Sequence, residues 1–160
     1  MQKYLVVSFI NPENVSDTFS AANWPLHCTL LPNFSTEASL EGVIQAVNKV
    51  ATSHQQIIVE IGDEALFGPD ANFPVSLVLP TRQILEFHAS LASRLEALHI
   101  TYDNPQFVHE GYRPHITIQE NTRVNQGDFL TIKVISLVDM MPDGDTTRRK
   151  VIKSFELSHD

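Results

Sequence analysis

Two similar stretches of sequence decide how this chain folds: Tyr112-Arg113-Pro114-His115-Ile116-Thr117-Ile118 and Trp24-Pro25-Leu26-His27-Cys28-Thr29-Leu30. Each contains the pattern His-x-Thr-apolar shortly after a proline. Successive side chains of an extended strand point to opposite faces of a sheet. We therefore expect two half-buried strands, each with a histidine and a threonine on one face and two apolar side chains on the other.

The length and charge of the chain limit what it can be. It has 160 residues and a formal net charge of −8, which predicts a single domain over residues 1–160 and argues against binding of DNA or long RNA through many phosphate contacts. A small nucleotide or a short RNA remains a suitable partner. The apolar run 4–10 is too short to span a membrane, and the single cysteine, Cys28, is expected in the core. We expect a cytoplasmic monomer.

Apolar residues at helical spacing predict two long helices, one over 37–53 and one from Thr81 to about His99. Thr36 and Thr81 are the expected N-caps. Runs rich in β-branched and aromatic residues predict strands at 5–9, 27–31, 57–61, 65–67, 75–79, 129–140 and 147–157.

Turn signals separate these elements. Pro32 is expected to end the first His-x-Thr strand, and Gly62-Asp63 is expected to turn between two short strands. Pro142-Asp143-Gly144 predicts a hairpin between the last two strands. The segments 13–23 and 104–111 are expected to be loops.

The order of the elements predicts the fold class. Each half of the chain holds one His-x-Thr strand, one long amphipathic helix and further strands, without regular βαβ alternation. This indicates an α+β fold with mainly antiparallel strands. We expect a bilobal, pseudo-duplicated molecule in which two sheets flank a central cleft and the helices lie outside.

At these residues the sequence resembles the 2H phosphoesterase superfamily, which includes RNA 2′,3′-cyclic phosphodiesterases and proteins named 2′-5′ RNA ligases. The stretches 27–30 and 115–118 match its two His-x-Thr/Ser-apolar motifs at all defined positions. The resemblance implies that each lobe brings one motif to a central cleft, and that the chemistry uses no metal or organic cofactor. Some members place positive side chains beside the second motif. Here Gln119 and Glu120 follow it, and Arg113 is the nearest cation.

Cleavage of a phosphodiester requires a base, an acid and hydrogen-bond donors for the phosphoryl oxygens. An imidazole with an ordinary pKa of about 6.5 serves as either base or acid near neutral pH. His27 and His115 are therefore the candidate catalytic pair, with their roles left open. Thr29 and Thr117 are the candidate phosphate-binding residues.

Three further residues are candidate substrate contacts. Trp24 and Tyr112 could stack on a base, with packing at the lobe junction as the alternative. Arg113 could bind phosphate or be an ordinary surface residue. Among the other histidines, His109 is close enough in sequence to line the mouth of the cleft, and His88 is expected to be structural or exposed. No ligand spacing for a metal is present.

The sequence therefore predicts a metal-independent phosphodiesterase acting on 2′,3′-cyclic phosphates or 2′-5′ linkages of small nucleotides or RNA ends. Three alternatives remain open. The first is a reversible 2′-5′ RNA ligase, which should favour a more basic surface. The second is a catalytically silent module that binds nucleotides or RNA, and the third is a purely structural interaction protein.

Overall fold

A computed structural model describes residues 1–159, so Asp160, the last residue of the predicted domain, lies outside the described residues. The described chain contains two α-helices, α1 (Leu40–Thr52) and α2 (Arg82–Glu96). The strands are β1 (Gln2–Phe9), β2 (Thr18–Ser20), β3 (His27–Thr36), β4 (Ile57–Phe67), β5 (Phe73–Val78), β6 (Thr101–Tyr102), β7 (His115–Thr117), β8 (Phe129–Ile132), β9 (Val134–Asp139) and β10 (Arg148–Glu156). Short 3-10 turns span Pro105–Phe107, His109–Gly111 and Pro142–Gly144.

The strands are hydrogen-bonded in the order β2-β10-β9-β1-β3-β7-β5-β4-β8, and β6 pairs with β3. Every pairing between these strands is antiparallel, which confirms the predicted α+β class. The prediction of two separate sheets is wrong, because β3 pairs with β7 and joins all the strands into one path. The pseudo-duplication into two lobes stays a prediction.

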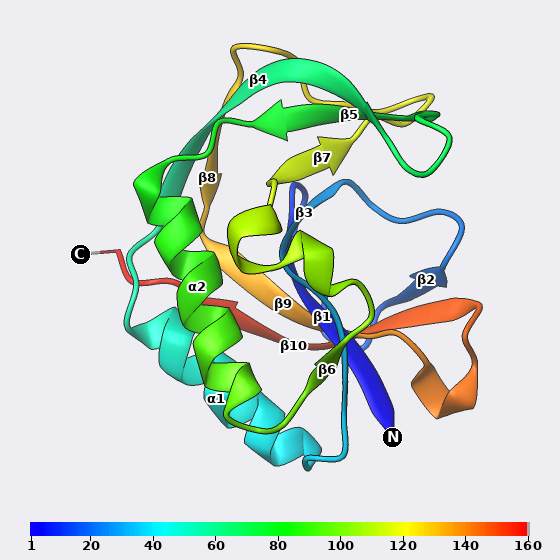
Figure 1. Cartoon of the computed structure of the whole chain (residues 1–160), viewed down its shortest axis with the longest axis vertical. Coiled ribbons are helices and arrows are strands. Elements are labelled where there is room, and N and C mark those ends of the chain that lie inside the picture. The colour runs from blue at the N-terminus through cyan, green and yellow to red at the C-terminus, as the bar shows by residue number, and fades with distance from the viewer. Residues whose placement is uncertain (160) are drawn as a thin grey trace.

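The strand path curves back on itself. Only Lys133 separates β8 from β9, although β8 pairs with β4 and β9 pairs with β1 and β10. Figure 1 shows the chain passing from β8 directly into β9. The predicted single strand over 129–140 is therefore two strands, because the chain changes partners at Lys133. The β9–β10 hairpin is confirmed.

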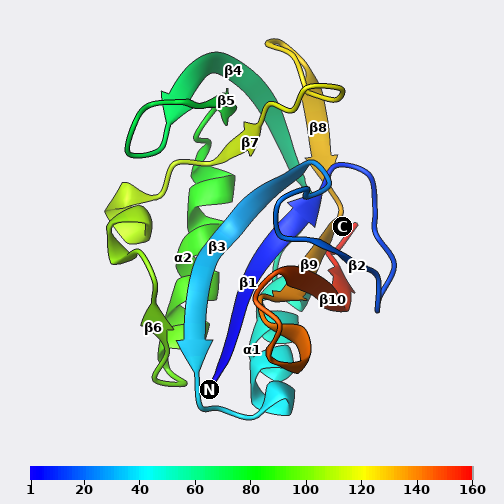
Figure 2. The same ribbon diagram turned by 90° about the vertical axis from the view of Figure 1, so that its right-hand side faces the viewer.

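The helices α1 and α2 lie side by side on one face of the sheet (Figures 1 and 2). Their apolar stripes enter one core cluster that also contains Cys28 of β3 and Ile116 of β7. Thr81 caps α2 as predicted, since its hydroxyl accepts from the Ile84 N–H. The predicted cap of α1 is wrong: Ser39 caps it, and the Thr36 hydroxyl accepts instead from the Ala38 N–H.

The opposite face of the sheet carries a smaller apolar cluster. Alternate residues of β1 meet side chains from β9 and β10 there, and Phe19 and Trp24 pack against the cluster. Strand β1 is therefore buried on both faces, in agreement with its position between β9 and β3. The predicted loop over 13–23 contains the short strand β2, which pairs with β10.

Two predicted strand ends are wrong for a common reason. Strand β3 continues through Pro32 because its pairing with β1 shifts register between Phe34 and Leu31, and such an irregularity tolerates a residue without an N–H. Strand β4 continues through Gly62 and Asp63 in the same way, with a register shift against β5. A proline or glycine at a bulge therefore bends a strand without ending it.

Candidate active site

One strand pairing brings the two His-x-Thr motifs together. Cys28 of β3 lies opposite Ile116 of β7 in an antiparallel pair. This register places His27 across from Thr117, and Thr29 across from His115. The central residues Cys28 and Ile116 are buried in the core, whereas all four polar residues are only partly buried and lie on the other face. The site therefore has two matching halves, each made of a histidine and the opposite strand's threonine.

The two imidazoles are held in the same way. His27 Nδ1 lies 2.8 Å from the Pro25 carbonyl oxygen, and His115 Nδ1 lies 2.8 Å from the Arg113 carbonyl oxygen. A carbonyl oxygen only accepts, so Nδ1 carries the proton in both rings. In a neutral ring this leaves Nε2 with a free lone pair. Each histidine is thus fixed in the tautomer that can take or give a proton at Nε2.

The surroundings of both histidines favour the neutral imidazole. Burial lowers the pKa of His27, and the nearby charge of protonated His115 lowers it further, against the opposing effect of the bond to Pro25. Burial also lowers the pKa of His115, and the positive charge of Arg113 acts in the same direction. The two rings are therefore electrostatically coupled, and a proton on one disfavours a proton on the other.

An aromatic side chain packs against each imidazole. The Trp24 ring lies 4.6 Å from the His27 ring, between centroids, at an interplanar angle of 35°. On the other side, the Phe67 ring lies 4.6 Å from the His115 ring at 65°. The Arg113 guanidinium sits 4.8 Å from the centroid of Phe67. These contacts restrict both histidines, and Arg113 is placed beside His115.

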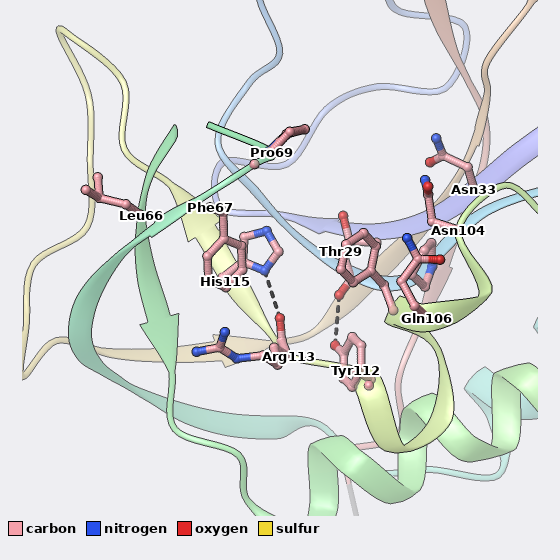
Figure 3. Close-up of a pocket in the computed structure, with 14 residues that line it drawn as sticks. Thr29, Asn33, Leu66, Phe67, Pro69, Asn104, Gln106, Tyr112, Arg113 and His115 are labelled. Carbon is pink, nitrogen blue, oxygen red and sulfur yellow. Dashed lines mark hydrogen bonds between the residues drawn. The ribbon is translucent and has the colours of Figure 1, made fainter. Parts of the chain in front are cut away.

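A cavity of about 800 Å³ opens beside the second histidine. Thr29, Tyr112, Arg113 and His115 line it, together with residues of the β4–β5 turn and of the loop before β7. His27 and Thr117 are not among the lining residues. Figure 3 shows His115 and Phe67 on one side of Thr29, with three amide side chains on the other. The cavity therefore reaches one histidine and one threonine directly.

Tyr112, which lines the cavity, and the buried His88 hold the backbone of β3 beside it. The Tyr112 hydroxyl donates to the Thr29 carbonyl oxygen at 2.8 Å, and His88 Nδ1 lies 2.8 Å from the Leu30 carbonyl oxygen. His88 Nε2 accepts from the His109 N–H at 2.9 Å. These side-chain hydrogen bonds occupy the carbonyl groups of Thr29 and Leu30. Both residues follow Cys28, the residue of β3 that pairs with β7, and the cavity opens at this point.

The family model of the 2′-5′ RNA ligase superfamily matches residues 13–136 of this chain. The chain belongs to that superfamily. This match confirms the predicted membership of the 2H phosphoesterase group. No curated protein sequence matches the chain.

Several solved structures have a fold similar to that of this chain. One described as a phosphoesterase has a TM-score of 0.63 at 16% identity, covering 98% of both chains. TT0787 of Thermus thermophilus has a TM-score of 0.62 at 17% identity, covering 97% of both chains. Escherichia coli LigT complexed with NADP+ has a TM-score of 0.61 at 16% identity, covering 98% of both chains. At these identities the likeness is one of fold.

The remaining predicted site residues of this superfamily member can now be placed. Trp24 contacts His27, and Arg113 lies at the rim of the cavity beside His115. Tyr112 lines the cavity, but it is buried and its hydroxyl is bonded to Thr29. His109, which is close in sequence to the second motif, does not line the cavity, because its ring turns to Glu96, with Nε2 2.7 Å from the carboxylate.

Sequence reasoning missed several residues of the site. In the sequence, Gln119 stands out only as a position without a cation. Its side chain donates to the Trp24 carbonyl oxygen at 2.6 Å, and this hydrogen bond ties the two motifs together. The sequence pattern places Phe67 in a separate short strand, and its contact with His115 depends on the long β4. His88 shows one detectable signal, since it occupies the apolar face of α2.

Neither a membrane-spanning helix nor a metal-binding cluster occurs among the described residues. Over residues 1–159, no helix is long and apolar enough to cross a membrane. In the same range, no three histidine, cysteine or acidic side chains are grouped so that they could hold a metal ion.

Proposed function

We propose that this chain is a phosphodiesterase that opens 2′,3′-cyclic phosphates, or cleaves 2′-5′ linkages, in small nucleotides or RNA ends. The observation that carries the proposal is the β3–β7 register, which sets His27 beside Thr117 and Thr29 beside His115. Both Nε2 atoms can exchange protons because both Nδ1 atoms are bonded to carbonyls. Membership of the 2′-5′ RNA ligase superfamily supports the same reaction class.

In the proposed hydrolysis, water attacks the phosphorus and one ester P–O bond breaks. One histidine takes the proton from the attacking water at Nε2. The other histidine gives its Nε2 proton to the leaving ribose oxygen, so that protons balance over the reaction. The hydroxyls of Thr29 and Thr117 donate hydrogen bonds to the non-bridging oxygens as negative charge develops on them. No metal or organic cofactor is required for these steps.

The lowered pKa values of His27 and His115 fit these roles as base and acid. A neutral imidazole is ready to act as the base near neutral pH. The acid must hold a proton, and the negative charge of a bound phosphodiester favours the protonated imidazole beside it. Substrate binding therefore prepares the acid. Which histidine serves as base for hydrolysis is left to experiment.

Small nucleotides are the proposed substrates. Structures of Escherichia coli LigT, a relative in fold, have been solved with NADP+, 3′-AMP and ATP. The net charge of −8 of the present chain disfavours a long RNA. For the same reason we rank 2′-5′ ligation of RNA below hydrolysis. Ligation would use the same proton transfers, with a ribose hydroxyl in place of water as the attacking group and a ring oxygen of the cyclic phosphate as the leaving group.

The test is turnover of the four nucleoside 2′,3′-cyclic monophosphates in excess chelator, followed by phosphorus NMR. Wild type should convert at least one of them, and His27→Ala and His115→Ala should each lose roughly a hundredfold to ten-thousandfold in kcat. His99→Asn, at an exposed histidine with positive φ, is the matched control and should keep full activity. Conversion that survives both alanine variants would refute the two-histidine mechanism. Binding without turnover by wild type would indicate the catalytically silent module. Turnover of 2′-5′ oligonucleotides alone would indicate that 2′-5′ linkages, and not cyclic phosphates, are the substrates.

A further inference from the structure

The imidazole of His27 lies in a cluster of aromatic rings and is not part of the cavity lining. The Trp24 ring is 4.6 Å from it between centroids, and the Phe9 ring is 6.3 Å from it. Phe19 packs edge-on against both of these rings, 4.9 Å from Trp24 and 6.1 Å from Phe9. Trp24 is therefore the ring nearest to His27, and a group that holds Trp24 also restricts His27.

An arginine from the far end of the sequence reaches this cluster. Arg149 of β10 lies opposite Phe19 of β2 in an antiparallel pair, so the two side chains share one face of the sheet. The guanidinium carbon of Arg149 lies over the Trp24 ring, 5.9 Å from its centroid. This distance is within the roughly 6 Å range of a cation–π interaction. Arg149 is thus placed to hold the Trp24 ring.

Backbone carbonyls fix the Arg149 guanidinium in this place. Its Nη1 lies 2.8 Å from the Met140 carbonyl oxygen and 2.9 Å from the carbonyl oxygens of Thr146 and Arg148. Its Nε is buried and, within residues 1–159, has no hydrogen-bond partner. A buried N–H without a partner costs free energy. The contacts that retain the cation are therefore the turn carbonyls at Nη1 and the Trp24 ring.

Both candidate catalytic histidines are flanked by an aromatic ring that carries a guanidinium. For His115 the ring is Phe67, and Arg113 supplies the guanidinium, 4.8 Å from the ring centroid. Arg113 lines the cavity, so a bound molecule can touch it. Arg149, which has the corresponding place beside the first motif, is not among the lining residues. An effect of Arg149 on the reaction must therefore pass through the Trp24 ring.

We infer that Arg149 is a positioning residue for His27: it fixes the Trp24 ring against the imidazole and so keeps Nε2 in place for proton transfer. This inference rests on the proposed function, because it assigns a proton transfer to His27. Without the guanidinium the Trp24 ring can turn away, and water then reaches the imidazole. Burial is the main cause of the lowered pKa of His27, so this pKa should rise toward its ordinary value of about 6.5.

The first variant is Arg149→Met, which keeps an apolar stem over the cluster and removes the charge and the donors. Proton NMR should show the pKa of His27 raised, by more than any change at His115. With a nucleoside 2′,3′-cyclic monophosphate, kcat should fall about tenfold or more and KM should change by less than about twofold. If Arg149→Met does not fold, Arg149→Gln, which keeps an amide donor, replaces it with the same expectations.

A double variant tests whether Arg149 acts through Trp24. Trp24→Leu should raise the pKa of His27 and lower kcat as Arg149→Met does, and Arg149→Met/Trp24→Leu should show little further loss, because both changes remove one contact. Arg148→Met is the matched control. Arg148 precedes Arg149 on β10, so its side chain points to the other face, and it donates to the Thr18 hydroxyl. Its loss should leave kcat and the pKa of His27 unchanged.

Two outcomes would overturn the positioning role: an unchanged pKa of His27 in the Arg149 variant, or multiplicative losses of kcat in the double variant. If wild type turns over neither cyclic phosphates nor 2′-5′ linkages, the proposed function fails. The pKa of His27 in the two single variants and the double variant then decides by itself whether Arg149 holds Trp24 against the imidazole. Shifts of this pKa that add up in the double variant would refute the contact.

Discussion

The imidazole of His88 stacks on the phenol ring of Tyr112, with ring centroids 3.9 Å apart and planes only 1° from parallel. The stack joins α2 to the residue three positions before His115. Both rings also bond to β3, since Tyr112 donates to the Thr29 carbonyl oxygen and His88 donates to the Leu30 carbonyl oxygen. One buried ring pair therefore connects the first motif with the segment that leads into the second.

Removal of the Tyr112 hydroxyl should disturb the site while leaving the stack in place. We expect Tyr112→Phe to lower the free energy of unfolding by about 1 kcal/mol, because the Thr29 carbonyl loses its buried donor. We also expect kcat to fall severalfold, since Thr29 is a proposed phosphate-binding residue. Urea unfolding and steady-state kinetics measure the two effects.

Tyr102→Phe is the control for this variant. Its hydroxyl donates to Glu96 at 2.7 Å, away from the cavity lining, so kcat should be unchanged. Equal kcat values for Tyr112→Phe and wild type would show that this hydrogen bond does not position Thr29.

His88 should make the stability of the protein depend on pH. Its ring donates at Nδ1 and accepts at Nε2, so it must be neutral in the folded state, and burial lowers its pKa. Below about pH 6.5 the unfolded chain binds a proton that the folded chain does not, so the free energy of unfolding falls as pH falls. Burial lowers the pKa values of His27 and His115 too, and these add to the effect.

The measurement is urea unfolding at several pH values between about 5 and 8. His88→Gln removes one of the titrating groups, so the slope of stability against pH should decrease by up to about 1.4 kcal/mol per pH unit. Asn48→Ala, at an exposed position of α1, removes no titrating group and should leave the slope unchanged. An unchanged slope in His88→Gln would mean that His88 takes up a proton in the folded state.

Local sequence pattern was enough to predict the helices and one cap, because α1 and α2 each bury a single apolar stripe and Thr81 precedes the second. It also predicted the face that His27 and His115 share with their threonines, because strand alternation is a local property. The two motifs could be identified for the same reason. The residues that contact the motifs from other segments could not be predicted from local pattern.

The contacts between distant segments required the structure. The pairing of Cys28 with Ile116 joins segments that lie far apart in the sequence, and no local pattern marks the bulges of β3 against β1. Pro32 and Gly62 look like strand ends because the residue types are the same at a turn and at a bulge. The sequence around Asn104 and Gln106 is typical of a connecting loop, because polar residues between two elements carry no sign of what they face.

The two candidate catalytic histidines, His27 and His115, should titrate as a coupled pair. The charge of protonated His115 lowers the pKa of His27, and the charge of Arg113 lowers the pKa of His115. We therefore expect His115→Gln to raise the pKa of His27, and Arg113→Gln to raise the pKa of His115. Proton NMR of the imidazole resonances measures both. Unchanged values would mean that burial alone sets these pKa values.

The same pKa shifts set the pH dependence of turnover. In the proposed mechanism the active form carries one protonated and one neutral imidazole, and it is most populated between the two pKa values, both of which are lowered. The maximum of kcat/KM should therefore lie below about pH 6.5. The maximum of kcat should lie at higher pH, because bound phosphate favours the protonated imidazole. A flat profile, or a kcat maximum more acidic than that of kcat/KM, would contradict this order.

The glycines at 111 and 62 should respond differently to alanine. A Cβ at Gly111 meets the backbone oxygen of Gln106 at 1.8 Å, whereas a Cβ at Gly62 meets the end of the Leu79 side chain at 2.7 Å. Backbone cannot move aside as a flexible side chain can.

We expect Gly111→Ala to cost roughly 1–3 kcal/mol in the free energy of unfolding and to raise KM, because Gln106 lines the cavity. Gly62→Ala should stay within about 1 kcal/mol of wild type, helped by the lower entropy of its unfolded chain. Urea midpoints and KM values for the two variants test this, and similar values for both would show that the loop around Gln106 adapts.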